Sequence, residues 1–285
     1  MSEREHARGR APFLRAYAML YVVWTAIPVV NVVLFSFNQN RSLTQWGGAS
    51  MRWYLTDPNN SIRLDPTIRA AVFQSLRLSV LVVVIAVPIA TAFALALNRW
   101  RGRGSGAANF VMMASFITPE LIVAVSLFLL FVHLLDVIGL GSLAQLIGLV
   151  VLALAYPVVI VRARLLSLGP EYEEAAMDLG ASPLSALRRV TIPLLFPAIF
   201  ASAAVIFALS LDDFVIVQQL SKDASDQTVA MFIYNAARTA PTPSANAVGT
   251  LLLIASTAVI VAAAAAYRRA ARRQGAGGLS PTGLA

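Results

Sequence analysis

The chain has no cysteine, only two histidines and a single lysine among its 285 residues. Without cysteine there is neither a disulfide framework nor a thiolate metal site, and His6 and His133 do not make a histidine cluster. The one lysine, Lys222, does not follow the glycine-rich loop that binds phosphate in P-loop ATPases. We therefore expect no metal site and no centre for ATP hydrolysis in this chain.

Charged residues are also scarce. They make up 13% of the chain, whereas they are roughly a quarter of a soluble domain. The net charge of +8 would suit a nucleic-acid partner, but the basic residues interrupt long apolar runs instead of forming one polar face, so we expect no nucleic-acid binding. With 58% hydrophobic residues, the composition indicates that membrane lipid surrounds most of the chain.

Long apolar segments define the expected fold class. A helix needs about 20 mostly apolar residues to cross the roughly 30 Å of hydrocarbon in a bilayer. Six segments reach this length, at 14–37, 76–97, 110–134, 143–161, 197–218 and 247–267. The first is too long for a signal peptide, and no small-residue cleavage site follows it. We predict an all-α integral membrane protein with six transmembrane helices, whose packing is aided by small residues such as Ala90, Ala94 and Ala204.

The basic residues predict the orientation of these helices. Most of the 22 fall on one side of the predicted spans, and the positive-inside rule places that side and both termini in the cytoplasm. We expect residues 1–13 to be a cytoplasmic segment, 14–271 the transmembrane domain and 272–285 a disordered cytoplasmic tail. The basic residues on the cytoplasmic side are Arg4, Arg8, Arg10, Arg15, Arg99, Arg101, Arg103, Arg162, Arg164, Arg188, Arg189, Arg268, Arg269, Arg272 and Arg273.

A long polar stretch lies between the first two predicted spans and faces outward on this topology. It contains Trp46, Trp53 and Tyr54, followed by the turn-forming run from Asp57 to Asn60. Two interpretations stay open for the aromatic residues. They are interfacial anchors at the edge of the membrane, or they contact a solute at the mouth of a pathway.

The cytoplasmic segment between the fourth and fifth spans predicts a helix-turn-helix. Gly169 stops the preceding helix, Pro170 occupies a first helical position, and Gly180 closes a short helix by tolerating a left-handed conformation. Ser182 then caps a second short helix, which we expect to end at Pro193.

The first of these short helices has two distinct faces. One carries Glu171, Glu174 and Asp178, and the other is smooth, with Ala175, Ala176 and Leu179. Small side chains allow another protein to approach closely, and carboxylates at the rim can meet its Arg or Lys. We interpret the helix as a docking element, and the alternative is an ordinary solvated loop helix.

The same segment resembles the EAA motif of ABC importer permeases. That motif reads EAA, three residues, G, nine residues, I-x-L-P. It is matched by Glu174-Ala175-Ala176, Gly180 and Val190-Thr191-Ile192-Pro193, with Val190 in place of Ile and Ile192 in place of Leu. The resemblance implies that segment 170–193 couples the spans to a separate ATPase. It assigns that role to Glu174, Ala175, Ala176, Asp178 and Gly180.

Further motifs resemble the second permease of the spermidine/putrescine importers. They are Ser36-Phe37-Asn38, Trp53-Tyr54, Ser210-Leu211-Asp212-Asp213-Phe214 and Asn246-Ala247-Val248-Gly249-Thr250. The resemblance implies a type I importer permease fold in the bacterial plasma membrane, and a transport subunit instead of an enzyme. It implies three partners: an ABC ATPase dimer that binds ATP and magnesium, a second permease expected to be a distinct chain, and an external solute-binding protein. No cofactor is implied for this chain.

Three carboxylates interrupt apolar segments, where a charge costs about 2.5–3.5 kcal/mol on insertion scales. They are Glu120 in the third span and Asp212 and Asp213 in the fifth. Such acids are expected to line a polar pathway and to attract a multiply protonated amine, with cation–π contacts from Phe214 or Tyr234. Alternatively, Asp212 pairs with Lys222 or Arg238, and Pro119-Glu120 marks a kink. We expect Arg77 to reach outward to the interface or to neutralise one acid.

Three rival functions remain to be weighed. An autonomous secondary transporter or channel needs no docking helix, and the EAA spacing argues against it. A membrane scaffold has little reason to place acids in apolar spans. The third rival keeps the ABC mechanism and changes the cargo to ferric ion, thiamine or an organophosphonate.

Overall fold

The structure is a computed structural model that describes residues 3–100, 102–135, 137–239 and 241–276. Most of the described residues are helical. Among them, β-type pairing is limited to one isolated antiparallel bridge between Asn38 and Ala49. Five continuous helical segments are long and apolar enough to cross a membrane, at Leu14–Ser36, Pro66–Arg99, Ser142–Leu168, Pro183–Asp212 and Pro243–Ala265. The all-α class predicted from the sequence is confirmed.

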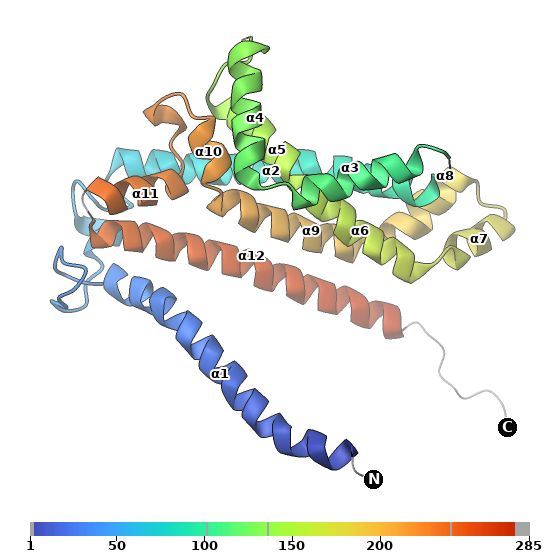
Figure 1. Cartoon of the computed structure of the whole chain (residues 1–285), viewed down its shortest axis with the longest axis horizontal. Helices are drawn as coiled ribbons and strands as arrows, with labels where there is room; N and C mark the ends of the chain where they lie inside the picture. The colour runs from blue at the N-terminus through green and yellow to red at the C-terminus, as the bar shows by residue number, and fades with distance from the viewer. Residues whose placement is uncertain (1–2, 101, 136, 240, 277–285) are drawn as a thin grey trace. The chain divides into compact units, whose positions relative to one another are not determined.

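The third predicted span is broken, not continuous. Helix α3 (Ser105–Ile117) and helix α4 (Glu120–His133) are bent by 103° at their junction (Figure 1). Thr118 is extended, with φ −61° and ψ 126°, because a residue before proline avoids the helical region, and Pro119 offers no N–H to continue the ladder. A single helix over 110–134 is therefore wrong, whereas a kink at Pro119-Glu120 is correct.

The chain forms two compact units: Met1–Arg69 with Ile233–Leu251, and Ala70–Phe232 with Leu252–Ala285. In the first unit, helix α1 (Glu3–Ser36) ends in a folded loop organised by Asn38. The Asn38 Nδ2 group donates to the carbonyls of Ser42 and Gln45 at 2.7 and 2.8 Å, and its Oδ1 accepts from Gly47 N–H at 2.8 Å. These hydrogen bonds fold the start of the polar stretch, from Asn38 to Gly47, into a compact loop.

Trp53 is the core of this loop. It lies in the short π-helix η1 (Arg52–Thr56), is 0% exposed, and donates its indole N–H to the Asn38 carbonyl at 2.6 Å. Tyr54 stacks on Phe37 and donates its hydroxyl to Ser36 at 2.7 Å. For Trp53, the expected role as interfacial anchor or solute contact is wrong, because the ring is enclosed by its own loop. Trp46 is half exposed and keeps both interpretations.

The loop is expected to weaken in acid through Asp57. Burial alone would raise the pKa of Asp57, but hydrogen bonds from Asn59 N–H and from the Arg52 and Asn60 side chains hold it below its ordinary value of 3.8. Since the folded pKa is the lower one, the ionised carboxylate stabilises the loop above pH 3.8, and this contribution is lost as the pH falls through the folded pKa. Acid titration of Trp53 fluorescence, in a variant with the other tryptophans changed to Phe, measures the loss. An identical transition in Asp57→Asn would contradict this assignment.

In the second unit, helices α2 (Pro66–Arg99), α5 (Ser142–Ala153), α6 (Ala155–Leu168) and α9 (Ile192–Asp212) share two apolar clusters. One cluster includes Leu78, Val82, Phe131 and Ile206, with contributions from α4. The other brings Ala90 and Ala94 of α2 against Val161 and Leu195. Both alanines are 0% exposed, so the expected use of small residues in helix packing is confirmed there.

The fifth predicted span differs at both ends. It begins earlier, because helix α8 (Pro183–Ala186) runs through a π-helical turn, η2 (Leu187–Thr191), directly into α9. Ile192 N–H donates to the Leu187 carbonyl, five residues back, which is the π-helical pattern. Because the α-helical hydrogen bonds are already interrupted here, the missing N–H of Pro193 does not end the helix. The predicted end of the second short helix at Pro193 is therefore wrong.

At its other end the span stops at Asp212 instead of continuing to residue 218. Asp213 is extended, with φ −61° and ψ 129°, and a new helix, α10 (Val215–Gln219), follows it. The Asp213 carboxylate accepts from Ile216 and Val217 N–H at 3.1 and 3.3 Å, the capping role for which aspartate is favoured. The apolar run hid this break because apolar residues continue after Asp213 into the start of α10.

The last helix, α12 (Pro243–Ala276), continues past the expected domain boundary at residue 271. The rest of the tail expected at 272–285 lies outside the described residues, as do Arg101 and Asp136. Helix α11 (Val229–Thr239) precedes α12, and the short turn η3 (Ala224–Asp226) precedes α11.

Candidate functional site

Helix α7 (Glu171–Asp178; Figure 1) is the short helix for which the sequence predicts a docking role. Gly169, with φ 72°, ends α6 before it, and the Ser182 hydroxyl caps α8 after it by accepting from Ser185 N–H at 3.3 Å. Both boundaries confirm the sequence prediction. Pro170 lies one position earlier than expected, as the capping residue of α7.

The spacing of the EAA motif has a local structural reason at the end of α7. Gly180 N–H donates to the Met177 carbonyl at 2.9 Å, and Ala181 N–H donates to the Ala176 carbonyl at 3.1 Å. This is the Schellman arrangement, which requires a left-handed residue at the position of Gly180. Gly180 has φ +90°, as predicted.

Replacing Gly180 with alanine is expected to destabilise this turn by about 1–2 kcal/mol, the cost of a left-handed conformation for an L-residue. The cost is purely conformational, because a Cβ at this position would meet nothing within 4 Å. Hydrogen exchange of the amides after α7 measures it. Gly106→Ala is the matched control, since that glycine also faces open space but has no left-handed φ. Equal protection in the two variants would contradict the prediction.

Most of the side chains assigned to coupling are presented to the outside. Glu174, Ala175, Asp178 and Gly180 are exposed, and Ala176 is half-buried. Leu179, on the smooth face, is 90% exposed.

Glu173, which sequence reasoning passed over, is the acid of α7 that points inward. Both its carboxylate oxygens accept from Arg99 Nη2, at 2.6 and 2.8 Å, and Thr191 Oγ1 donates to Oε2 at 3.1 Å. No local pattern in the sequence indicates this contact, since Arg99 ends α2 and Thr191 lies in η2.

The two helix breaks bring Glu120 and Asp213 together. Glu120 is the first residue of α4 and Asp213 caps α10, and their carboxyl groups lie close enough to interact electrostatically. Both are half-buried. Carboxylates at helix N-termini are favoured by the helix dipole, and unwound segments at breaks are where transporters commonly hold charged solutes. Of the predicted acids, these two form a pair.

Gly148 allows α10 to lie close to α5 and so positions Asp213. A Cβ at Gly148 would come within 2.6 Å of Leu220 and 2.7 Å of Ile216. A buried network holds the same helix from the side. Gln145 Nε2 donates to the Val217 carbonyl at 3.0 Å and to the Asp226 carbonyl at 3.1 Å.

Asp226 is the anionic centre of this network and is 6% exposed. Its Oδ1 accepts from Ser142 N–H at 2.9 Å and from the Ser142 hydroxyl at 2.7 Å, and its Oδ2 accepts from Lys222 N–H at 3.2 Å. Gln74 of α2 donates to the Ser142 hydroxyl at 2.8 Å. The sequence signal that could have found the network is Gln145, a polar residue in an apolar span.

The remaining predicted pathway residues lie apart from this pair or are already engaged. Asp212 ends α9 with its side chain exposed, and within the described residues it makes no ion pair with Lys222. Phe214 packs against the core of the second unit. Tyr234 belongs to the first unit, where the Arg238 guanidinium lies 4.7 Å over its ring. Arg77 is exposed, which agrees with an outward-reaching side chain.

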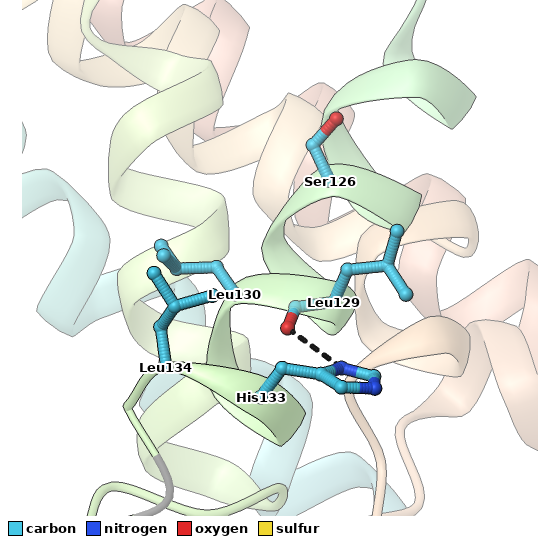
Figure 2. A pocket seen from close by; sticks show the side chains of 5 residues that line it. All are labelled: Ser126, Leu129, Leu130, His133 and Leu134. Atoms are coloured by element: carbon cyan, nitrogen blue, oxygen red, sulfur yellow. Dashed lines mark hydrogen bonds between the residues drawn. The ribbon is translucent and has the colours of Figure 1, made fainter.

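A separate pocket of about 510 Å³, wide open and mostly apolar, lies along α4 (Figure 2). It is lined by Ser126, Leu129, Leu130, His133 and Leu134. His133 turns its Nδ1 to the Leu129 carbonyl at 3.2 Å (Figure 2). Neither acid of the pair lines this cavity, so its chemistry suits lipid or another apolar surface and not a cation.

Long apolar helices, two neighbouring carboxyls at helix breaks and a short, exposed helix between two spans are features of a membrane permease. Residues 85–275 match the family described as binding-protein-dependent transport system inner membrane component, and the chain belongs to this family. It is therefore the inner-membrane permease subunit of an ABC importer, a transport component and not an enzyme.

Curated relatives and solved structures agree with this family. The chain is 33% identical over 250 residues to the putrescine transport system permease protein PotI of Escherichia coli (strain K12), covering 86% of each chain. It is 32% identical over 243 residues to the spermidine/putrescine transport system permease protein PotC of Haemophilus influenzae, covering 85% of this chain and 91% of that one. A chain of a bacterial ABC transporter that imports the acidic polysaccharide alginate shares the fold, with TM-score 0.71, 18% identity and coverage of 93% and 99%.

Proposed function

We propose that this permease imports polyamines of the putrescine and spermidine class. Two independent lines support the proposal. Relatives that match most of the chain are named as putrescine and spermidine/putrescine permeases, and two carboxyl groups near enough to interact lie at breaks in apolar helices. The second line carries the proposal, because it concerns this chain's own residues.

The carboxyls of Glu120 and Asp213 form a site suited to an amine cation. Two carboxylates side by side in a region of low dielectric repel each other, and a cation between them relieves this repulsion. Because polyamines carry several ammonium groups, one group can bind here while others meet Asp212 or acids contributed by the second permease. A neutral or anionic cargo would gain nothing from this pair.

Coupling to ATP takes place through α7 in this proposal. Both termini and α7 lie in the cytoplasm, and α7 docks on one subunit of an ABC ATPase dimer that binds ATP and Mg²⁺. Ala175 and Ala176 permit close approach, Glu174 and Asp178 meet basic groups, and Gly180 fixes the turn. A second permease completes the pathway, and an external solute-binding protein delivers the cargo. The loaded receptor and ATP each favour the outward-open state, which couples them.

Uptake by the purified complex tests the function. The chain is reconstituted in proteoliposomes with its ATPase, second permease and receptor, and labelled putrescine and spermidine are supplied with ATP or with a non-hydrolysable analogue. We expect uptake that needs both ATP hydrolysis and all partners. Ferric ion, thiamine and an organophosphonate serve as alternative cargoes.

The rival functions give different results in the same assay. ATP-dependent uptake of another cargo but not of polyamines would retain the permease and reject the substrate. Uptake driven by an ion gradient without the partners would indicate an autonomous transporter. The docking role is tested separately in the same assay. Glu174→Arg is expected to abolish ATPase binding, whereas Glu171→Arg, at the far end of the same helix, is expected to weaken that binding less.

A further inference from the structure

The Glu173 carboxylate joins three helical elements of the second unit at one point. It lies on α7, its ion pair reaches Arg99 at the last position of α2, and its second hydrogen bond reaches Thr191 in η2. Since η2 runs on without a break into α9, the contact ties the docking helix to two membrane-spanning segments.

This connection is selective among the acids of α7. Glu171, Glu174 and Asp178 are exposed, whereas the Glu173 side chain is 23% exposed and Thr191 is 8% exposed. Arg99 is favourably placed as a cation at the carbonyl end of α2, where the helix dipole attracts positive charge. Both Glu173 oxygens are engaged, and Oε2 accepts from both partners.

The contact is not needed for α7 to fold. The C-terminal end of α7 is closed by its own Schellman turn. At its N-terminal end, the Glu173 and Glu174 N–H groups donate to the Pro170 carbonyl. Partly exposed ion pairs also contribute little to the stability of a fold. What the pair does supply is a fixed position of α7 relative to α2 and η2, because it crosses between elements that are remote in the sequence.

We propose that Glu173 is the positioning residue that transmits movement of the docking helix to the membrane spans, with Arg99 and Thr191 as its two anchors. When a bound ATPase displaces α7, the ion pair carries α2 along and the hydrogen bond carries η2 and α9. This proposal rests on the proposed docking of α7 to an ATPase. Without the contact, the ATPase still binds the exposed face of α7 and hydrolyses ATP, but the spans follow less completely.

A double-mutant cycle on the full complex tests the proposal. The readout is the amount of solute imported per ATP hydrolysed, with ATPase co-purification and thermal stability measured alongside. We expect Arg99→Gln and Glu173→Gln each to lower this ratio by about fivefold, the lower end of typical coupling between sites. The double variant should be no worse than either single one, because both remove the same interaction. Arg99→Lys keeps the charge and should restore most of the ratio.

Asp223→Asn is the control, an exposed acid outside α7 whose contacts to Ser225 an amide oxygen can preserve. A second readout does not depend on the cargo. Because the chain has no cysteine, spin labels can be placed at Asn98→Cys and Tyr172→Cys, on α2 and α7. Their distance distribution should stay narrow with and without ATP in the native complex and broaden in Glu173→Gln.

Two results would overturn the proposal. One is a native transport ratio with a narrow label distance in both single variants, and the other is a double variant whose loss is the product of the two single losses. A native complex that hydrolyses ATP but imports no polyamine would instead reject the proposed cargo, while the label distance would still decide the role of Glu173.

Discussion

Polyamine uptake by the Glu120→Gln/Asp213→Asn variant is expected to fall by about ten- to a hundredfold, since a hydrogen bond to a charged group contributes about 1.5–3 kcal/mol. Both changes remove charge and keep shape. The amide oxygen introduced by Asp213→Asn can still accept from Ile216 and Val217 N–H, so the start of α10 is retained. Initial rates of labelled spermidine uptake in proteoliposomes measure the effect.

The ATPase rate separates this loss from a folding defect. Neither acid lies on α7, so ATP hydrolysis by the variant complex is expected to stay near the native rate. Asp223→Asn is the matched control, an exposed acid whose contacts to Ser225 an amide oxygen can preserve. Native uptake by the double variant would remove Glu120 and Asp213 from the pathway. Equal losses in the control would show that the effect is not local.

Removing the Asp226 carboxylate is expected to cost about 1–3 kcal/mol for each buried donor left unpaired. Asp226→Ala strands the main-chain N–H groups of Ser142 and Lys222, and the Ser142 hydroxyl must find another acceptor. The start of α5 and the loop before α11 are then free to separate. Thermal unfolding in detergent, followed by tryptophan fluorescence, measures the lower stability.

Two variants make this prediction specific to Asp226. Asp226→Asn keeps one acceptor oxygen and is expected to fall between the native protein and Asp226→Ala. Asp223→Ala removes an acid from the same loop, but that acid is exposed and bonds only to its neighbour Ser225 among the described residues, so a much smaller change is expected. If the two alanine variants unfold at the same temperature, the buried network does not stabilise the unit.

The sequence predicted correctly those helix ends that depend on residues close together in the chain. Gly169, Gly180 and Ser182 set the ends of α6, α7 and α8 through backbone conformation and capping, and all three behave as the sequence predicts. Hydrophobic length located the five continuous candidate spans and the region of the broken third one, because lipid imposes the same requirement wherever the chain crosses it. The exposed faces of α7 followed from helical periodicity in the same way.

The breaks and the buried contacts depended on residues far apart in the sequence. Nothing near Asp213 indicates that it would start a new helix instead of continuing the old one, since that depends on α10 packing against α4 and α5. Trp53 was expected to be an interfacial anchor or a solute contact. Its enclosure could not be predicted locally, because it depends on the hydrogen bond to the distant Asn38 carbonyl. Glu173 with Arg99 and Asp226 with Ser142 are likewise pairings that no local pattern encodes.

The helix that runs without interruption from Pro183 to Asp212 has a mechanical consequence. At a rise of 1.5 Å per residue its length is about 45 Å, with the turn after α7 at one end and Asp213 at the other, so a movement proposed for α7 would act on it as on a lever. A lever that pivots near its middle moves its ends in opposite directions, and a tilt of about 10° would displace each end by about 4 Å. Opening on one side of the membrane would then accompany closing on the other, without any signal passing through the side chains between them.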